Sequence, residues 1–215
     1  MRFIDNNHCK YPMLRSLSIA MLLTLSFAAL SFAEEATFTT AIIVYEYSGG
    51  GAGTETVYFD KANNRINQES TVTWTMGGAT KVKESREMFD GKLFYTFDFD
   101  NNLVISEPVN NPDALAAMFP SPAEYGVPAG GEQVLGRECK LFQGTLMSGC
   151  FWNGIPIMES ISNTFSPELN HAKKAVDIQL DVPIPEEKFQ VSSDMRVLNP
   201  QQALMEMQEM FKRKR

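Results

Sequence analysis

Few residues in this chain have the types and spacing that catalysis or metal binding requires. It holds three cysteines and two histidines, and Cys9 and His8 precede an apolar N-terminal run that we expect to be removed. A Ser–His or Cys–His catalytic pair would have to use His171, which lies in a polar stretch typical of a surface turn. Zinc sites need clustered histidines and cysteines. We therefore predict no enzyme, no metal site and no cofactor.

The remaining cysteines, Cys139 and Cys150, lie on either side of a turn signal at Gly144-Thr145. If that turn closes a hairpin, the two side chains can face each other across antiparallel strands. A redox pair is more often spaced as Cys-x-x-Cys. We predict a structural disulfide, stabilising by about 3 kcal/mol in the loop-entropy relation.

Two further motifs resemble ligand-binding loops but lack their defining residues. A calcium loop beginning at Asp98 would need glycine at its sixth position and glutamate at its twelfth, where Leu103 and Val109 stand. The glycine-rich run 49–53 is not followed by the Gly-Lys-Ser/Thr of a phosphate loop. We expect a hairpin turn at the first and a flexible hairpin loop at the second.

Aromatic side chains on predicted strands are the strongest indication of a binding site. Because strand side chains alternate between faces, about half must point each way. Most are expected in the core, but a curved and partly filled sheet would let some line an apolar cavity, together with adaptable methionines. The candidates for this cavity are Trp74, Phe94, Tyr95, Phe97, Met118, Phe119, Trp152 and Met158.

The elements that would position these residues are mostly strands. Runs of β-branched and aromatic residues, punctuated by turn signals, predict about nine strands. They cover 36–47, 54–60, 65–76, 81–89, 92–99, 103–106, 133–143, 149–161 and 175–182. Asn111-Pro112-Asp113 predicts the start of a helix that reaches Phe119, and residues 120–131 are expected to form a loop. Such spacing favours a mainly β sandwich, barrel or strongly curved sheet with one or two helices.

The C-terminus predicts a second helix. Asn199-Pro200 is a cap and first-turn pair, and apolar residues recur near helical spacing within 201–214. The basic end, residues 212–215, suits the negative pole of the helix dipole. A membrane-surface or partner-docking role stays open for this segment, as does cuprous ion binding by its methionines, although a buried stripe explains Met207 and Met210 more simply.

The N-terminus has the pattern of a secretory signal peptide. Arg15 precedes an apolar run that ends in Ser31-Phe32-Ala33, with small residues at the outer two positions. The run is shorter than the roughly 20 residues that span a bilayer. We predict cleavage after Ala33, a start at Met13 as an alternative to Met1, and a periplasmic product that does not span the membrane.

The processed chain is acidic. Removing residues 1–33 removes Arg2, Lys10, Arg15 and Asp5, which takes the net charge from −7 to −9. An acidic body repels phosphate backbones, so nucleic acid is not an expected partner. The remaining length fits one β domain over residues 34–198, followed by the C-terminal helix and basic tail over 199–215.

Three segments resemble the LolA/LolB-like lipoprotein-carrier superfamily. The first is Arg86-Glu-Met-Phe-Asp-Gly-Lys-Leu-Phe-Tyr-Thr-Phe-Asp98, followed by Asn101-Asn-Leu-Val104. The others, Val134-Leu-Gly-Arg-Glu-Cys139 with Phe151-Trp-Asn-Gly-Ile-Pro-Ile157, and Val182-Pro-Ile-Pro-Glu-Glu-Lys-Phe189, resemble an exported branch of unknown function. The resemblance spans roughly residues 38–191.

The resemblance implies a curved antiparallel half-barrel with helices over its concave face, where such carriers hold acyl chains. The carriers' lipid-handling positions have no residue-by-residue match in this chain. The leading hypothesis is therefore a periplasmic, non-enzymatic carrier for an apolar or acyl-bearing ligand. The alternative is an envelope module that binds another protein through the C-terminal helix.

Overall fold

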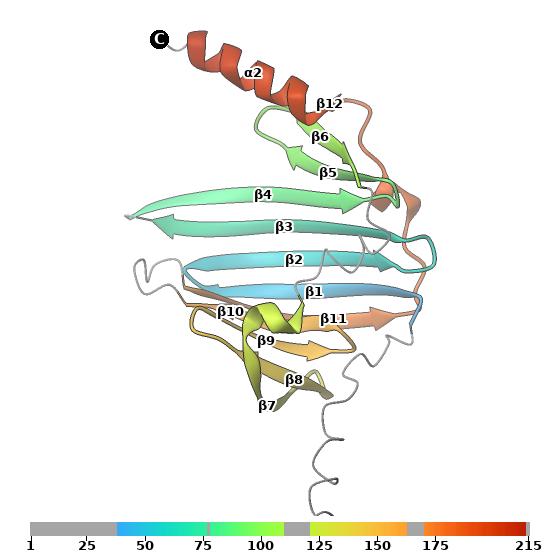
Figure 1. Cartoon of the computed structure of the whole chain (residues 1–215), viewed down its shortest axis with the longest axis vertical. Helices are drawn as coiled ribbons and strands as arrows, with labels where there is room; N and C mark the ends of the chain where they lie inside the picture. The colour runs from blue at the N-terminus through green and yellow to red at the C-terminus, as the bar shows by residue number, and fades with distance from the viewer. Residues whose placement is uncertain (1–37, 77, 110–120, 163–169, 214–215) are drawn as a thin grey trace, which may run out of the picture. The chain divides into compact units, whose positions relative to one another are not determined.

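The computed structural model describes residues 38–76, 78–109, 121–162 and 170–213. The chain divides into Met1–Glu34 and Glu35–Arg215, and all described residues belong to the second unit. This unit contains one twelve-stranded sheet in the order β12-β6-β5-β4-β3-β2-β1-β11-β10-β9-β8-β7 (Figure 1). Every neighbouring pair is antiparallel except β12 with β6. The sheet is open, with β12 and β7 at its edges, which confirms the predicted mainly β class.

The elements follow one another in chain order. The strands are β1 (Thr40–Gly49), β2 (Gly51–Asp60), β3 (Arg65–Met76), β4 (Ala79–Phe89), β5 (Leu93–Asp98), β6 (Leu103–Pro108), β7 (Val127–Val134), β8 (Arg137–Gln143), β9 (Met147–Trp152), β10 (Ile155–Ile161), β11 (His171–Leu180) and β12 (Arg196–Leu198). Two short 3₁₀ turns, η1 (Pro122–Tyr125) and η3 (Glu186–Phe189), and the helix α2 (Pro200–Arg213) complete the described part. The helix predicted over residues 111–119 lies outside the described residues.

The strand count exceeds the nine predicted because two expected strands are each divided by a tight turn. Leu135-Gly136 separates β7 from β8, and Asn153-Gly154 separates β9 from β10; all four residues have positive φ. Two consecutive positive φ angles are the signature of a two-residue type I′ hairpin turn, for which Asn-Gly is the preferred pair. β7 also occupies part of the segment expected to be a loop, and the three-residue β12 has no recognisable strand pattern.

The glycine-rich run corrects another expectation. β1 ends at Gly49 and β2 begins at Gly51, so most of the expected loop is strand. At Gly53, a Cβ atom would lie 2.0 Å from the carbonyl oxygen of Thr71 on the neighbouring strand. Glycine is thus needed here for the close approach of two backbones.

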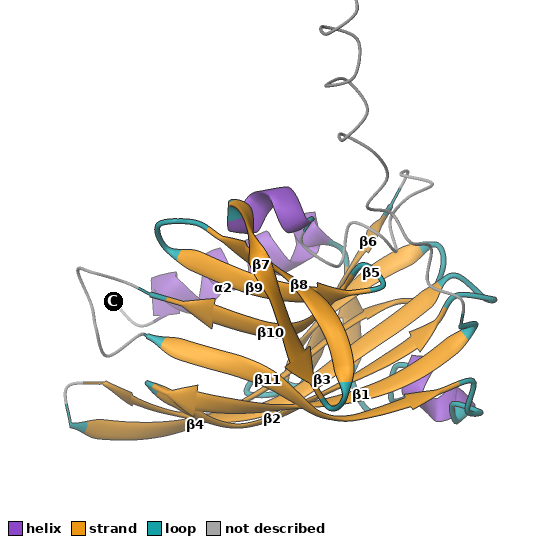
Figure 2. Cartoon of the chain, turned by 90° about the horizontal axis from the view of Figure 1, so that it is seen from below, coloured by secondary structure: helices purple, strands orange, loops and turns teal. Residues whose placement is uncertain are grey.

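The sheet is curved (Figure 2), and the main core lies on one of its faces, which we call the concave face. We define this face by Ala41, Ile43, Tyr45 and Tyr47 of β1 and their cross-strand partners, since paired residues point to the same side. The stronger curvature of a half-barrel stays a prediction. The buried residues of the main cluster are Phe38, Ala41, Ile43, Tyr45, Val57, Phe59, Ile66, Phe89, Val134, Cys139, Cys150, Ile155, Ile157, Ala175 and Ile178.

A β-bulge in β11 changes which of its side chains point to the concave face. The sequence predicts Val176, Ile178, Leu180 and Val182 on one face, but the register with β1 shifts between Val44 and Tyr45. Ala175 then pairs with Tyr45 on the concave face, and Val176 is 40% exposed. An inserted residue reverses the alternation beyond it.

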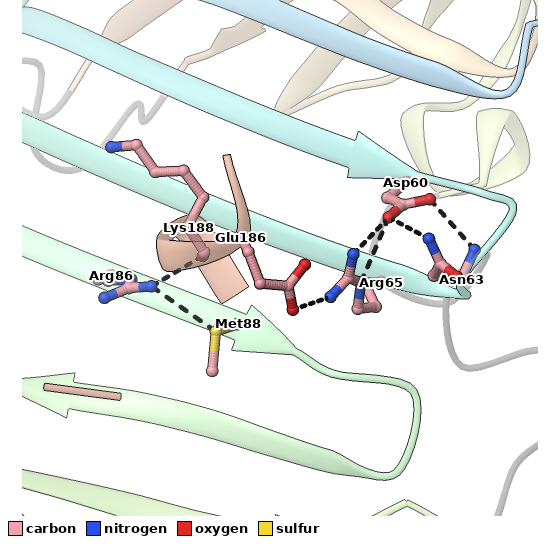
Figure 3. Close-up of polar contacts among 7 residues, drawn as sticks. All are labelled: Asp60, Asn63, Arg65, Arg86, Met88, Glu186 and Lys188. Carbon is pink, nitrogen blue, oxygen red and sulfur yellow. Dashed lines mark hydrogen bonds and ion pairs between the residues drawn. The ribbon is translucent and has the colours of Figure 1, made fainter. Parts of the chain in front are cut away.

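The opposite face is covered in part by the C-terminal strap, which we define as residues 182–195. Its Phe189 joins Met88, Phe97 and Val104 in a second buried cluster. The Arg86 guanidinium donates hydrogen bonds to the carbonyl oxygens of Lys188 (2.8 Å) and Gln190 (3.2 Å) and lies over the Phe97 ring. Figure 3 shows the hydrogen bond between Arg86 and Lys188 beside a second attachment, described next.

The second attachment joins a turn of the sheet to η3. Arg65 bridges Asp60, 2.7 Å away, and Glu186, 2.6 Å away (Figure 3). Asp60 also accepts hydrogen bonds from the backbone and side-chain amides of Asn63, which closes the β2–β3 turn. Together the two arginines hold the strap against β3 and β4, and so direct the chain toward β12.

The C-terminal helix begins as predicted. The Asn199 side-chain oxygen accepts from the Gln202 backbone amide, and the Gln202 side-chain oxygen accepts from the Asn199 amide, which is a reciprocal capping box. Ala203 is buried, whereas Leu204 is 52% exposed and does not belong to a buried stripe. The side chains of Met207, Met210 and Phe211 lie outside the described part.

Candidate functional site

A hollow of about 220 Å³ opens on the concave face over β1 to β4. Alternate positions of the four strands line it, because cross-strand partners share a face. Phe59 and Ile66 form an apolar cross-strand pair on this face. The hollow begins at Gln68, the next residue of β3 that points to the same face. Its lining is Tyr47, Glu55, Gln68, Ser70, Val72, Trp74, Lys83, Ser85 and Glu87.

An indole ring forms one end of this hollow. An ideal Cβ atom on Gly51 would lie 2.8 to 2.9 Å from three atoms of the six-membered ring of Trp74, its cross-strand partner. Three nearly equal distances mean that the ring lies face-on over the glycine. Trp74 also meets the His171 ring at nearly a right angle, with centroids 5.2 Å apart. One face of the indole therefore lies against the β2 backbone at Gly51, and the half-buried Trp74 also lines the hollow.

A second hollow, of about 170 Å³, adjoins the first and shares Tyr47 with it. It is lined by Tyr47, Glu159, Ser160, Ile161, His171 and Lys173. Three strands, β1, β10 and β11, contribute these residues, and the register pairs Glu159 with Lys173 and Ile161 with His171. The two hollows together extend across the concave face.

A chain of charged groups joins the two hollows. The Lys173 ammonium lies 3.1 Å from Glu55 and 2.6 Å from Glu159, and it also lies over the Tyr45 ring. The Tyr47 hydroxyl donates to Glu55 at 2.7 Å, and the Tyr125 hydroxyl of η1 donates to Glu159. Each charge in this network has an opposite charge or a hydroxyl donor, as partly buried charges require.

The network sets the protonation of its members. Burial lowers the pKa of the Lys173 ammonium, but the carboxylates of Glu55 and Glu159 outweigh it and raise the pKa above its ordinary value. Burial and the carboxylate of Glu55 raise the pKa of Tyr47 far above 10, and burial with Glu159 does the same for Tyr125. At neutral pH, Lys173 is therefore charged and both phenols are neutral.

Three polar side chains that line the first hollow do not belong to the charged network around Lys173. Within the described part of the chain, Gln68, Lys83 and Glu87 make no side-chain hydrogen bond or ion pair. All three residues line the hollow: Lys83 lies nearer to Trp74, and the cross-strand partners Gln68 and Glu87 lie further along the strands. These groups are free to bind a ligand.

The structure distributes the predicted cavity residues over two faces of the sheet. Trp74 lines the first hollow, and Phe94 pairs with the buried Phe89 on the concave face. Tyr95 and Phe97 belong to the opposite face and the second cluster. Their separation follows from β alternation, because neighbours on a strand point to opposite sides.

The other predicted cavity residues are in the core or outside the described part. Trp152 and Met158 pack against the main cluster, and the Trp152 ring stacks on Phe38 with centroids 6.1 Å apart. Met118 and Phe119 lie outside the described residues. A ligand-binding role for all eight stays a prediction; of the two hollows above, the first is lined by Trp74.

Tyr95 has a structural contact of its own. Its hydroxyl donates to Asp90 at 2.8 Å, and Asp90 also accepts from the backbone amides of Lys92 and Leu93. Burial and this hydrogen bond raise the pKa of Tyr95 to about 12. Burial opposes ionisation of Asp90, but the three donors outweigh it and lower the pKa of the carboxyl. The pair holds the turn between β4 and β5.

The sequence reasoning missed the charged network. Glu55 stands two residues before Val57 and four before Phe59, so strand alternation places a carboxylate on the apolar face of β2. A carboxylate at a position where the alternation predicts a core residue could have indicated a buried ion pair. Its partners could not be identified, because Lys173 is 118 residues away from Glu55.

The disulfide prediction is confirmed in its geometry. Cys139 and Cys150 lie on β8 and β9 with their sulfur atoms at disulfide distance and their Cα atoms 5.4 Å apart. The hairpin turns at Gly144, whose amide donates to the Met147 carbonyl oxygen. Among the described residues, no three acidic, histidine or cysteine side chains gather as a metal site would require, and no helix is long and apolar enough to cross a bilayer.

Comparison with known proteins gives similarities of structure alone. No family model matches the chain, and no curated protein matches it. An uncharacterised conserved protein from Thermus thermophilus matches with a TM-score of 0.48 and 11% identity over 76% of this chain and 91% of that one. MucB matches with a TM-score of 0.41 and 12% identity over 77% of this chain and 62% of that one. PNGF-II matches with a TM-score of 0.33 and 10% identity over 76% of this chain and 31% of that one.

Proposed function

We propose that this is an exported, non-enzymatic binding protein that holds a small ligand in the hollow on its concave face. The observation that carries the proposal is a hollow lined by Trp74 together with three polar side chains, Gln68, Lys83 and Glu87, that make no hydrogen bond or ion pair within the described residues. Binding sites typically combine an apolar surface with a few convergent polar groups. The saturated network around Lys173 supports a binding role over a catalytic one.

The polar side chains that line the hollow change the kind of ligand that we expect. A bare acyl chain in this hollow would remove polar side chains from water without replacing their hydrogen bonds, at a cost of about 1–3 kcal/mol for each group. An acyl-bearing ligand, as the resemblance to lipoprotein carriers implies, would therefore place a polar part here. We include periplasmic location and signal-peptide removal after Ala33 in the proposal.

Native mass spectrometry tests the function. The full chain is expressed with residues 1–33, purified from a periplasm without detergent, and its mass is compared before and after organic extraction. We expect a processed protein beginning at Glu34 that carries a bound small molecule in a fraction of the population. An apo mass alone, together with no binding to any lipid or polar small molecule offered, would contradict the proposal.

A second candidate function has support from one observation. Leu204 and Met205 of α2 and Val197 of β12 are each at least 50% exposed near one another in the sequence, at an edge of the sheet. Exposed apolar residues at an open edge are typical of protein contacts. If α2 is a docking element, deleting residues 199–215 should abolish a partner captured by the full chain, and an unchanged set of partners would exclude this role.

A further inference from the structure

We infer that the first hollow binds an organic anion at its Trp74 end, where the ammonium groups of Lys81 and Lys83 hold the negative group. The apolar part of the same ligand lies against Val72 and Trp74. This inference rests on the proposed binding function and specifies the charge of the polar group that the hollow receives. It depends on the placement of the two lysines, on the distribution of charge over the concave face, and on the apolar residues beside the lysines.

Lys81 and Lys83 lie side by side on the concave face of β4. Residues two apart on a strand point to the same face, with their Cα atoms about 7 Å apart. The register pairs Lys81 with Trp74 and Lys83 with Val72. Lys83, Val72 and Trp74 line the hollow, and both lysines are exposed. The two ammonium groups are therefore carried at one end of the hollow, where a ligand can reach them from solvent.

The two lysines make no hydrogen bond or ion pair with any residue that the structure describes. By contrast, Lys173 and Lys188 each lie within 3.1 Å of a glutamate carboxylate. The adjacent Glu84 points to the opposite face of the sheet. Two positive charges at neighbouring positions of one face repel each other. An anion bound between them would remove this repulsion and would accept charge-assisted hydrogen bonds from both.

The carboxylates of the concave face lie too far away to neutralise this end of the hollow. Glu87 is four residues beyond Lys83 on β4, about 14 Å along the strand. Glu55 is two strands away from Lys83, about 10 Å across the sheet, and has Lys173 as a partner. Both distances exceed the Debye length of about 8 Å at physiological ionic strength. The Trp74 end therefore carries an excess of positive charge in a protein that is acidic as a whole.

Apolar residues stand beside the lysines. Trp74 is half-buried and Val72 is buried, and each is the cross-strand partner of one of the lysines. Gly53, which stands between Tyr47 and Val72 in the register, adds no side chain there. An inorganic anion would gain nothing from these residues, whereas an organic anion would bury its apolar part against them. The negative group is then the polar part that an acyl-bearing ligand places in this hollow.

The lysines also occupy an open stretch of β4. Among the described strands, β5 pairs only with residues 87–89 of β4, so the part that carries both lysines has no neighbour on that side (Figure 1). Lysines on an open edge hinder the addition of a further strand. That role requires the charges but no ligand, so lysine variants can distinguish it from anion binding.

The test uses the processed full-length protein and amphiphiles that share one octyl chain. Octyl sulfate is negative, octyl glucoside is neutral and octyltrimethylammonium is positive, and each is titrated below its micellar concentration by calorimetry and by tryptophan fluorescence. We expect octyl sulfate to bind about tenfold or more tightly than the other two and than inorganic sulfate, with an affinity that falls as salt is added. Octanoate, dihexanoylphosphatidylglycerol and naphthoate then show whether a fatty acid, a phospholipid or an aromatic acid fits best.

Lysine variants locate the site. Lys81→Gln combined with Lys83→Gln should weaken octyl sulfate binding about tenfold or more, as loss of hydrogen bonds from charged groups does, and leave octyl glucoside binding unchanged. Lys174→Gln, which changes an exposed lysine on the opposite face, is the matched control and should bind as the wild type does.

Three outcomes would overturn the inference. Equal affinity for octyl sulfate in the double variant would do so, and self-association of that variant would then assign the two lysines to protection of the open edge. Tighter binding of octyl glucoside or octyltrimethylammonium would overturn it as well, yet leave the proposed binding function intact. No binding of any probe would contradict both.

Discussion

The ammonium of Lys173 lies 2.6 Å from a carboxylate oxygen of Glu159, its cross-strand partner on the neighbouring strand of the sheet. Replacing it by methionine, as Lys173→Met, would leave two carboxylates facing each other at the centre of the concave face. Removing one partner from a largely buried ion pair costs about 3–5 kcal/mol. We expect the free energy of unfolding to fall by about 3 kcal/mol, as measured by urea denaturation.

The adjacent Lys174 supplies the matched control. It is exposed on the opposite face, so Lys174→Met should change stability by less than about 0.5 kcal/mol, as surface substitutions usually do. The double variant Lys173→Met with Glu159→Gln should recover part of the loss, because it removes one of the two facing charges. Equal effects of the two lysine variants would contradict the assigned network.

The contact between Gly51 and Trp74 leads to a second prediction. Gly51→Ala places a methyl group within 2.8 Å of the indole, so the ring must move off the strand. Overpacking of this kind typically costs about 1–3 kcal/mol. The cost should fall when Trp74→Ala is combined with it, and urea denaturation of the four proteins in a double-mutant cycle measures the coupling. Strictly additive effects would show that the two residues do not touch in solution.

Arg86 attaches the C-terminal strap to the sheet. Arg86→Lys keeps the charge but cannot maintain the set of hydrogen bonds to Asn67, Lys188 and Gln190. We expect a loss of about 2 kcal/mol and faster amide hydrogen exchange over residues 186–198. Exposed Glu84 on the same strand is the control, through Glu84→Gln. Unchanged exchange in the strap would refute its attachment by this residue.

The hydrogen bond between Tyr95 and Asp90 should make stability depend on pH at both extremes. The pKa of Asp90 is lowered in the folded state, so its contribution is present above the unfolded value of about 3.9 and is lost as pH falls through the folded value. The pKa of Tyr95 is raised to about 12, so its contribution is complete below pH 10 and is lost as pH rises toward 12.

Comparison of the wild type with Tyr95→Phe isolates this hydrogen bond. The difference in urea midpoint between the two proteins should be constant at intermediate pH. It should shrink below about pH 4 and above about pH 10, the unfolded values of the two groups. A difference that is the same from pH 3 to pH 11 would show that the bond does not form in solution.

The disulfide between Cys139 and Cys150 should contribute to stability although both residues lie within a cluster that is already packed. Replacing both by serine removes the cross-link, for which the loop-entropy relation gives about 3 kcal/mol. The thermal midpoint of this variant should match that of wild-type protein unfolded under reducing conditions. An oxidised wild type that is no more stable than the double variant would argue against a bridge.

Much of the fold was predictable because its signals are local. Residues 98–102 form the expected turn, the strands around them and around Asp90-Gly91 begin and end close to the predicted positions, and Asn199-Pro200 caps the C-terminal helix. Turn residues and caps act through their own backbone geometry, so a short window of sequence contains the information. The two missed I′ turns at residues 135–136 and 153–154 were equally local, and the Asn-Gly pair at the second was a readable signal.

What the sequence determined by itself was the mainly β class, the cysteine pair and the helical C-terminus, because each follows from side-chain chemistry within a few residues. The tertiary structure decided which faces meet: the bulge that exposes Val176, the division of Phe94 from Tyr95, and the meeting of Glu55 with Lys173. These features depend on strand order and register between residues distant in the chain. A shift of one residue in that register would exchange the faces of a strand, and no local pattern of side chains determines it.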